Sequence, residues 1–396
     1  MKPRFTLPDP PEALKQRSTE LTRKIRQTLK RHGSLPFSRF MELALYTPGL
    51  GYYASGLPKI GADGDFITAP EISPLFARCL ARQASQILSK LEQPNVIEFG
   101  AGKGTLARDF LLALDEANQP LETYYIIELS ADLKQKQAET LAPLPESLQQ
   151  KVVWLDQLPQ EPISAVIIAN EVLDAMPVEK LRLEAEQTLR GFVVYNDEKQ
   201  TFEWDYHTIS EPDLQKTCNQ ILKQIGTPSP QGYETEVNAN IHPWLRSIAD
   251  FLHQGALLLI DYGYTRQEYY QPARKMGTLR CHYQHRAHSD PFFYPGLQDI
   301  TAHVDFTQVA EAGFDVGFKI AGFTTQAHFL MSSGILELSA ELSDPDNIVS
   351  SLKLAQQIKT LTLPNEMGEN FKVIALTKNI DLPLMGFQLR DLRHQL

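Results

Sequence analysis

The N-terminal part of the chain, up to about residue 91, has its apolar positions at helical rather than alternating spacing. Residues 11–32 form one apolar helix face, and Gly33 then ends the predicted helix. The residues of this face are Leu14, Leu21, Ile25 and Leu29. Further helices are expected over residues 38–46 and from Pro74, a residue favoured in a first helical turn, to about residue 91. Residues 1–91 are therefore interpreted as a helical extension.

From residue 92 onward the pattern changes to short apolar runs separated by helical segments. Residues 104–117 and 131–141 have helical periodicity and follow the first two runs. Strands that alternate with helices form βαβ units, and their parallel sheet is covered by helices on both faces. We therefore predict an α/β fold with a mostly parallel, seven-stranded sheet. The expected strands are residues 95–100, 123–128, 151–156, 164–171, 255–263, 316–323 and 371–378.

Two long segments interrupt this alternation and are predicted to be insertions in a core that covers residues 92–396. Residues 181–250 contain the β-like runs GFVVY and TFEWDYH, and residues 264–300 are rich in Tyr, His, Arg and Pro. Such insertions lie near the functional edge of a sheet and often shape a substrate pocket. A surface excursion without a role in the site explains the first insertion equally well.

Composition narrows the class of protein. The chain has 396 residues, of which 42% are hydrophobic and 22% charged, as in ordinary soluble globular proteins. Its 48 acidic residues exceed its 38 basic residues, and the net charge of −10 argues against a nucleic-acid partner. Apolar runs such as residues 256–260 are far shorter than the ~20 residues of a membrane span. We see no targeting segment, and three distant cysteines without a CxxC pair fit a reducing cytoplasm.

The most distinctive motif is VIEFGAGKGT, which lies between the first expected strand and the helix that follows it. Its glycines, Gly100, Gly102 and Gly104, allow a sharp turn and the close approach of a ligand, and the helix N-terminus attracts an anion. The dinucleotide fingerprint GxGxxG requires its third glycine one residue later, so a nicotinamide dinucleotide is disfavoured. With Glu98 upstream, the form ExGxGxG resembles the first motif of class I S-adenosylmethionine-dependent methyltransferases.

Two acidic residues end the next two expected strands, at the edge of the sheet where ligands of open α/β folds bind. Glu128 can accept hydrogen bonds from ribose hydroxyls. Taken alone it is better explained as an acid at a helix N-terminus, whereas beside the glycine loop ribose binding is favoured. Asp156 ends its strand in the same way and could reach an adenine amino group, and an acid at a helix N-terminus explains it about as well.

Several motifs in order resemble one family, that of the bacterial MidA-like proteins and the mitochondrial complex I assembly methyltransferase. The resemblance runs from about residue 34 to residue 378 and rests on motifs that are mostly not general to methyltransferases. The motifs are FSRFMELALYTPGLGYYA, DGDFITAPEISPLFA, VIEFGAGKGTLARDFL, IIANEVLDAMPVEKL, LLLIDYGY, DITAHVDFTQVAEAGF and MGENFKVIALTK.

The resemblance implies a class I methyltransferase (Rossmann-like) fold with S-adenosyl-L-methionine as the cofactor. Mitochondrial members methylate arginine on a core subunit of respiratory complex I, so a protein substrate of this kind is the expected partner. The loop around Asp65, Phe66, Thr68, Glu71 and Ser73 would help to close over the cofactor. The predicted cofactor-binding residues are Glu98, Gly100, Ala101, Gly102, Gly104, Glu128, Asp156, Asn170, Thr68 and Glu71.

The segment NEVLDAMP, residues 170–177, begins where class I methyltransferases place the residues that meet the methyl acceptor. If the segment is helical, Glu171 and Asp174 share one face, and two carboxylates suit the planar fork of a guanidinium. They would hold the nitrogen in line with the methyl group. A helix that Asn170 merely caps is the plainer explanation and is compatible with this role. Asn170, Glu171 and Asp174 are thus predicted to be catalytic.

The segment CHYQHRAH, residues 281–288, raises the question of a metal site. The spacing of its cysteine and histidines matches no common zinc signature, and methyl transfer from a sulfonium needs no metal, so we predict none. The residues of such a site would be Cys281, His282, His285 and His288. His285 and the segment DITAHVDF are instead expected to line the acceptor pocket, with His303 as a further catalytic candidate, although a structural role explains these histidines equally well.

The sequence thus predicts in-line methyl transfer from S-adenosylmethionine to a nitrogen, with a protein arginine as the first choice of acceptor. Two alternatives remain open at this point: a cofactor-binding assembly factor with little catalysis, and a methyltransferase that acts on a small molecule or RNA. Turnover to S-adenosylhomocysteine with a candidate subunit separates the first alternative, and salt-sensitive binding would reveal an RNA partner.

Overall fold

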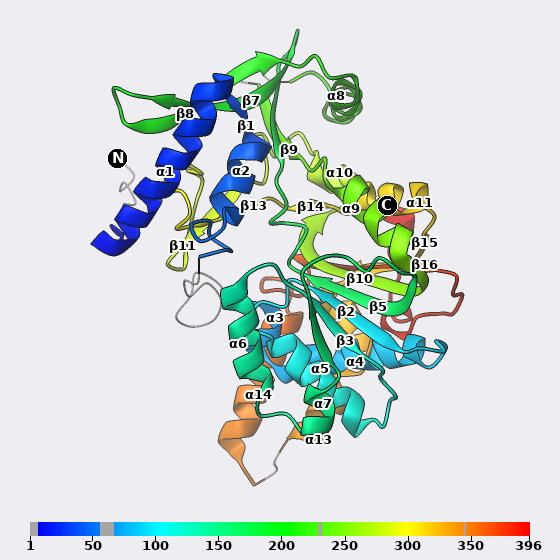
Figure 1. The fold of residues 1–396 in the computed structure, drawn as a ribbon. Helices are drawn as coiled ribbons and strands as arrows, with labels where there is room; N and C mark the ends of the chain where they lie inside the picture. The colour runs from blue at the N-terminus through cyan, green and yellow to red at the C-terminus, as the bar shows by residue number, and fades with distance from the viewer. Residues whose placement is uncertain (1–6, 56–66, 229–231, 344–345) are drawn as a thin grey trace. The chain divides into compact units, whose positions relative to one another are not determined.

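The computed structural model describes residues 7–55, 67–228, 232–343 and 346–396, and these form two compact units (Figure 1). Unit 1 consists of the described residues within 1–66, 175–240 and 267–303, and unit 2 of those within 67–174, 241–266 and 304–396. Most of both expected insertions lies in unit 1, whereas residues 241–250 of the first and 264–266 of the second belong to unit 2. Residues 67–91, which the sequence analysis grouped with the N-terminal extension, also belong to unit 2.

The N-terminal helices of unit 1 form where the apolar spacing predicts them. Helix α1 (Glu12–His32) buries Leu21, Ile25 and Leu29, and Gly33 ends it with a φ of 79° while its N–H donates to the Leu29 carbonyl. Helix α2 (Phe37–Tyr46) follows and buries Phe37 and Phe40. Both helices contribute to one apolar core with strands of unit 1.

The β-like runs of the first insertion are strands of an antiparallel sheet in unit 1. The strand order is β1-β7-β6-β9, with β8 also paired to β7. GFVVY lies in β7 and TFEWDYH in β8, as expected. A three-stranded sheet, β12-β11-β13, is formed by part of the second insertion. The bounds are β1 Leu35–Pro36, β6 Glu179–Leu183, β7 Thr188–Asn196, β8 Thr201–Thr208, α8 Pro212–Ile225, β9 Tyr233–Val237, α10 Arg266–Tyr269, β11 Arg280–Tyr283, β12 Arg286–His288 and β13 Asp299–Thr301.

All seven strands expected in the core form one sheet in unit 2, and the short strand β14 pairs with the end of β10 as an eighth member. The order is β15-β16-β10-β5-β2-β3-β4. The pairs from β10 to β4 are parallel, while β16 is antiparallel to both of its neighbours. The predicted mostly parallel α/β sheet is thus confirmed. The bounds are β2 Asn95–Phe99, β3 Tyr124–Ile127, β4 Val152–Leu155, β5 Ile163–Asn170, β10 Leu252–Tyr264, β14 Val304–Asp305, β15 Lys319–Thr325 and β16 Phe371–Lys378.

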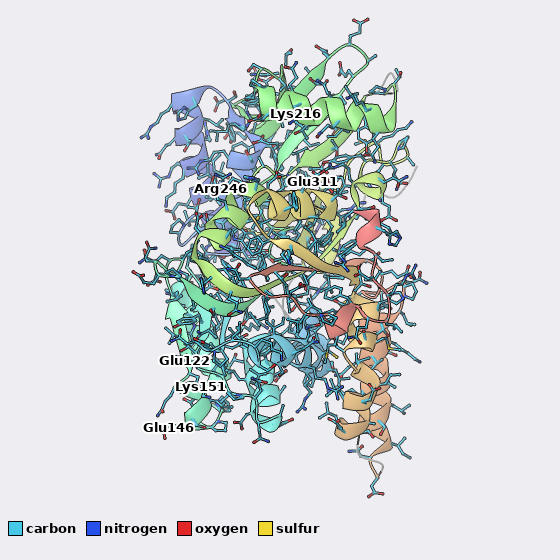
Figure 2. The ribbon with its side chains drawn as sticks, turned by 90° about the vertical axis from the view of Figure 1, so that its right-hand side faces the viewer. Glu122, Glu146, Lys151, Lys216, Arg246 and Glu311 are labelled. Carbon is cyan, nitrogen blue, oxygen red and sulfur yellow. The ribbon has the colours of Figure 1, made fainter. Side chains whose placement is uncertain are left out.

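Helices cover both faces of this sheet, because its central strands are apolar on both sides. Val166 and Ile168 of β5 pack in one core with residues of α4 and α5, while α9 and α11 contact β10 on the other face (Figure 1). The outer surfaces of α9 and α11 carry charged residues such as Arg246 and Glu311 (Figure 2). The helices of unit 2 are α3 Ala69–Ile72, α4 Pro74–Leu88, α5 Thr105–Glu116, α6 Ala131–Leu141, α7 Glu146–Gln149, α9 Ile241–Phe251, α11 Phe306–Asp315, α12 Gln326–Ser332, α13 Ile335–Leu342 and α14 Ile348–Thr362, with 3₁₀ turns η1 Met385–Phe387 and η2 Arg393–Gln395. Within the described ranges, no helix has the length and apolar character needed to cross a membrane.

Candidate functional site

The order of the strands indicates where unit 2 binds a ligand. From β2 the chain runs outward through β3 and β4, and then returns to form β5 on the opposite side of β2. In open α/β sheets, ligands bind outside the carboxyl ends of the strands at such a reversal point. The glycine loop follows β2, Glu128 follows β3, and Asn170 ends β5. The residues predicted from separate motifs are therefore brought to one edge of the sheet.

The glycine loop after β2 is a tight turn built from backbone conformations that favour glycine. Gly100, Gly102 and Gly104 have φ values of 65°, 53° and 86°. The N–H of Gly104 donates to the carbonyl of Ala101 at 2.7 Å, and Gly104 is the N-cap of α5. A Cβ atom on Gly100 would lie 2.9 Å from Cγ2 of Val172. Gly100 is exposed, so the loop presents bare backbone to a ligand.

Glu98 lies in β2 beneath this loop and accepts a hydrogen bond from the neighbouring strand β3. Its side chain is buried in β2, where Oε2 accepts a hydrogen bond from the Tyr124 hydroxyl at 2.8 Å. Burial raises the pKa of Glu98 from its ordinary 4.5 to about 7, the Tyr124 hydrogen bond opposes this rise, and the charge of Glu128 adds to it. This hydrogen bond joins β2 to β3 below the loop. The predicted role of Glu98 in cofactor binding stays a prediction.

Glu128 is held in a defined orientation next to the loop. Its Oε1 accepts the backbone N–H of Ser130 at 2.8 Å, and its Oε2 accepts from Nε2 of Gln137 at 3.1 Å. Gln137 also donates to the Gly102 carbonyl at 3.0 Å. Gln137 is not predictable from the sequence, because a single glutamine in an amphipathic helix carries no signal that it will be buried in a site.

The predicted covering segment is tied to the first turn of α5. Thr105 donates its hydroxyl hydrogen bond to the Glu71 carboxylate, and the N–H of Glu71 donates to the carbonyl of Thr68 at 3.0 Å. Ser73 caps α4 by accepting the N–H of Leu75 at 3.3 Å. Glu71 and Thr68 therefore lie beside the glycine loop, while Asp65 and Phe66, which were predicted to belong to the same segment, lie outside the described residues.

Asp156 follows β4 and has a largely exposed side chain. Its side chain is 81% exposed and forms an ion pair with Lys134 of α6. An exposed ion pair of this kind contributes little to stability. The expected contact of Asp156 with adenine stays a prediction.

The segment after β5 is an irregular turn and not a helix. Glu171 and Asp174 therefore do not share a helix face, as they would if the segment were helical. Glu171 has a φ of 53°, which is strained for a residue with a side chain, and its N–H donates to the Ile260 carbonyl at 2.9 Å. Asn170 Nδ2 lies 3.3 Å from Glu171 Oε1. The buried Oδ1 of Asn170 has no hydrogen-bond partner among the described residues.

Asp261, at the end of β10, holds this turn in place and was not predicted. Its Oδ2 accepts the backbone N–H groups of Leu173 and Asp174 at 3.0 and 3.2 Å, and its Oδ1 accepts that of Tyr262 at 2.9 Å. Burial, and then the charges of Asp174 and Glu171, raise the pKa of Asp261 well above its ordinary value. The Tyr262 hydroxyl donates to the Asp174 carboxylate. One acidic cluster is thus formed by the carboxyl groups of Glu171, Asp174 and Asp261. It lies after β5 and β10, and β5 is the neighbour of β2, the strand that precedes the glycine loop.

His303 and the histidine-rich segment belong to unit 1, whereas the acidic cluster belongs to unit 2. The N–H of His303 donates to Thr278 Oγ1 at 3.2 Å. Cys281 is buried and pairs across the β11–β12 hairpin with His288. No group of three or more His, Cys, Asp or Glu side chains is placed to hold a metal ion within the described ranges. The predicted catalytic role of His303 stays a prediction.

The residues present fit S-adenosyl-L-methionine. Gly100 is exposed and carries no side chain, so a ligand can approach the backbone of the loop, and Asn170 Oδ1 is a buried acceptor that a ligand's donor can satisfy. The Glu128 carboxylate has acceptor capacity beyond the two hydrogen bonds described, which suits ribose hydroxyls.

The chain is similar to known methyltransferases in sequence and in structure. A sequence model of the family described as "Putative S-adenosyl-L-methionine-dependent methyltransferase" matches residues 79–324, which include the glycine loop and the acidic cluster. Over 405 residues the chain is 28% identical to the mitochondrial protein arginine methyltransferase NDUFAF7 homolog of Drosophila melanogaster, covering 93% of this chain and 88% of the relative. It is 28% identical to mitochondrial protein arginine methyltransferase NDUFAF7 of Mus musculus, covering 90% and 84%.

A solved structure extends the similarity to almost the whole chain. The crystal structure of a Burkholderia thailandensis protein bound to S-adenosyl-homocysteine has a TM-score of 0.93 and 41% sequence identity, and the match covers 99% of this chain and 100% of that one. S-adenosyl-homocysteine is what S-adenosyl-L-methionine becomes after it has given up its methyl group. The chain therefore belongs to this family of S-adenosyl-L-methionine-dependent methyltransferases, shares their α/β fold, and uses S-adenosyl-L-methionine as its cofactor.

Proposed function

We propose that the enzyme transfers methyl groups to arginine nitrogens of a protein, and that this protein is a subunit of the respiratory complex I type. The observation that carries the proposal is the acidic cluster of Glu171, Asp174 and Asp261 after β5 and β10. Carboxylates pair with a guanidinium through charge-assisted, bidentate hydrogen bonds. The Drosophila and mouse relatives are protein arginine methyltransferases, which supports the same acceptor here.

The electrostatics of the cluster favour a cationic acceptor over a neutral one. Burial first, and then the like charges of Asp174 and Glu171, which repel that of Asp261, raise the pKa of Asp261. A guanidinium bound between these groups relieves the repulsion, whereas a hydroxyl or an apolar carbon does not. This preference distinguishes arginine from most small-molecule acceptors, and it disfavours the phosphate backbone of RNA.

The roles of the side chains follow from their contacts. When bound, S-adenosyl-L-methionine supplies an electrophilic methyl group. Glu171 and Asp174 hold the guanidinium so that one nitrogen faces that methyl group, and the Tyr262 hydroxyl keeps the Asp174 carboxylate in one orientation. Asp261 acts through the backbone of the turn and is a positioning residue. The nitrogen that gains a methyl group loses a proton, and the Glu171 carboxylate accepts it.

Two further parts of the sequence prediction belong to this proposal. Thr68 and Glu71, tied to Thr105 beside the glycine loop, help to cover the cofactor. The enzyme works in the bacterial cytoplasm, where its acceptor subunit would meet it before assembly.

Mass spectrometry of arginine methylation tests the proposal. The proteome of cells with the enzyme is compared with that of cells without it and of cells that express the Glu171→Gln variant. Methylarginine sites that disappear in both deficient strains support the proposal and identify the acceptor. The purified enzyme should then methylate the corresponding peptide and not its Arg→Lys counterpart. Unchanged arginine methylation, together with methyl transfer to RNA or a small molecule, would contradict the proposal. Retained subunit assembly in the Glu171→Gln strain would instead indicate an assembly factor that needs no catalysis.

A further inference from the structure

Gln137 of α6 is a fully buried glutamine whose carboxamide links three consecutive strands of the sheet at their cofactor-binding edge. Its Nε2 donates to the Gly102 carbonyl, in the loop after β2, at 3.0 Å. The same nitrogen donates to Glu128 Oε2, after β3, at 3.1 Å. Its Oε1 accepts the indole N–H of Trp154, in β4, at 2.9 Å. Both N–H groups of the Gln137 carboxamide and its oxygen therefore have hydrogen-bond partners.

These contacts allow only one orientation of the carboxamide. If the group were turned over, its oxygen would face the Gly102 carbonyl and the Glu128 carboxylate, which are both acceptors, and its NH₂ group would face the Trp154 donor. Trp154 thus selects the orientation in which the amide hydrogens point at the loop and at Glu128. The backbone of Gly104 packs closely against the same residue, because a Cβ on Gly104 would lie 3.2 Å from Cα of Gln137.

We propose that Gln137 is a positioning residue for the cofactor, which fixes the glycine loop and the Glu128 carboxylate relative to each other before S-adenosyl-L-methionine binds. A ligand that contacts both the loop and Glu128 binds best when the distance between them is already set, because binding then orders fewer groups. Without the Gln137 amide, the Gly102 carbonyl and the buried Glu128 carboxylate each lose a hydrogen bond. The carboxylate can then turn away from the direction in which the ribose hydroxyls require it.

Calorimetric titration with S-adenosyl-homocysteine measures this effect without any turnover. Gln137→Met keeps the length of the side chain and removes its hydrogen bonds, and we expect its dissociation constant to rise by about tenfold or more. Gln83→Met is the matched control, because Gln83 is equally buried in α4 but bonds to Gly386 N at 2.8 Å and to Gln86 at 3.0 Å. The control should lose stability and keep its affinity for S-adenosyl-homocysteine within about twofold.

The indole N–H signal of Trp154 in ¹⁵N–¹H NMR spectra provides a second readout. Trp154→Phe assigns the signal among those of the three tryptophans. In the wild-type enzyme the signal should shift when S-adenosyl-homocysteine binds, although the indole N–H is occupied by Gln137 and so is not itself available to the ligand. In Gln137→Met the signal should start at the position of an indole without this hydrogen bond and should respond less to the ligand.

Trp154→Phe also serves if Gln137→Met does not fold, because it frees the Gln137 oxygen and leaves both amide contacts in place. We expect Trp154→Phe to raise the dissociation constant for S-adenosyl-homocysteine, and an unchanged dissociation constant in a folded Trp154→Phe enzyme would overturn the proposal. A Gln137→Met enzyme that binds S-adenosyl-homocysteine as tightly as the wild type would overturn the proposal. Equal losses of affinity in Gln137→Met and Gln83→Met would also overturn it, since both would then reflect general destabilisation.

Discussion

The carboxylate of Asp261 accepts the backbone N–H of Asp174 at 3.2 Å, so the end of β10 determines the conformation of the turn that follows β5. These strands are neighbours in the sheet but are far apart in the sequence. The turn carries Glu171 in a strained backbone conformation, which persists because Asp261 and the Ile260 carbonyl hold the surrounding N–H groups. The acidic cluster is thus organised by backbone hydrogen bonds as well as by its own charges.

Asp261→Asn should disrupt this turn. An asparagine has one acceptor oxygen, so either the N–H of Tyr262 or those of Leu173 and Asp174 would face an NH₂ group. We expect a loss of about 1–3 kcal/mol of stability and a methylation rate lower by roughly tenfold or more. Urea unfolding and steady-state kinetics measure the two effects, with Asp250→Asn on the exposed surface of α9 as the control. A stable variant with normal activity would show that Asp261 does not position the site.

Glu171→Gln and Asp174→Asn test the carboxylates that are proposed to hold the acceptor. Each change keeps the size of the side chain and removes a charge-assisted hydrogen bond worth about 1.5–3 kcal/mol, so the methylation rate should fall roughly ten- to a hundredfold. Affinity for S-adenosyl-homocysteine should change much less, because the glycine loop and Glu128 are the residues predicted to carry that binding. Methylation kinetics and calorimetric titration with S-adenosyl-homocysteine on the same variants measure the two effects. Equal loss of rate and affinity would assign these acids to the cofactor, and unchanged rates would make them structural.

Gly100→Val should abolish cofactor binding. A Cβ at this position would lie 2.9 Å from Val172 Cγ2, and the φ of 65° is unfavourable for valine, so the loop would have to change its conformation. Gly226→Val is the control, because Gly226 also has a positive φ of 73° but no heavy atom lies within 4 Å of its Cβ position. Calorimetry with S-adenosyl-homocysteine should show binding to the control alone. Normal binding by Gly100→Val would remove the loop from the site.

The raised pKa of Glu98 predicts that its contribution to the stability of the folded protein falls as the pH rises. The pKa of its buried carboxyl group is raised from 4.5 to about 7, so the folded protein binds its proton more tightly than the unfolded chain does. The resulting stabilisation is present below about pH 4.5 and is lost as the pH rises through 7. Glu98→Gln can still accept from the Tyr124 hydroxyl and does not titrate, so its stability should fall less than that of the wild type between these pH values. Thermal unfolding of both proteins in matched buffers measures the difference, and parallel curves would contradict the assignment.

Chelation should leave the activity unchanged. Methyl transfer from a sulfonium requires no Lewis acid, and the histidine-rich segment 281–288 has no recognised zinc spacing. Methylation rates before and after dialysis against EDTA provide the measurement. A rate that falls with the chelator and recovers with added zinc would direct attention back to Cys281 and its neighbouring histidines.

Local signals in the sequence were sufficient for the N-terminal helices, the seven strands of the core sheet and the glycine loop. The apolar face of α1 and the seven strands of the sheet follow from the spacing of apolar residues, which depends on the geometry of each element alone. The positions of Gly100 and Glu128 at one edge follow as well, because parallel strands bring their carboxyl ends together. The sequence does not show that β5 lies on the opposite side of β2 from β3, because this position depends on which strands pair in the folded sheet.

The sequence by itself therefore determined the class of fold and the position of the glycine loop, and it singled out the segment whose carboxylates are proposed to hold the acceptor. Only the tertiary structure decided that residues 170–177 form an irregular turn held by Asp261, and that Gln137 joins the loop to Glu128. The physical reason is the range of the interactions. Hydrophobic periodicity and glycine turns act between near neighbours in the chain, whereas a buried carboxylate or carboxamide receives its role from donors and acceptors that folding brings to it from other strands.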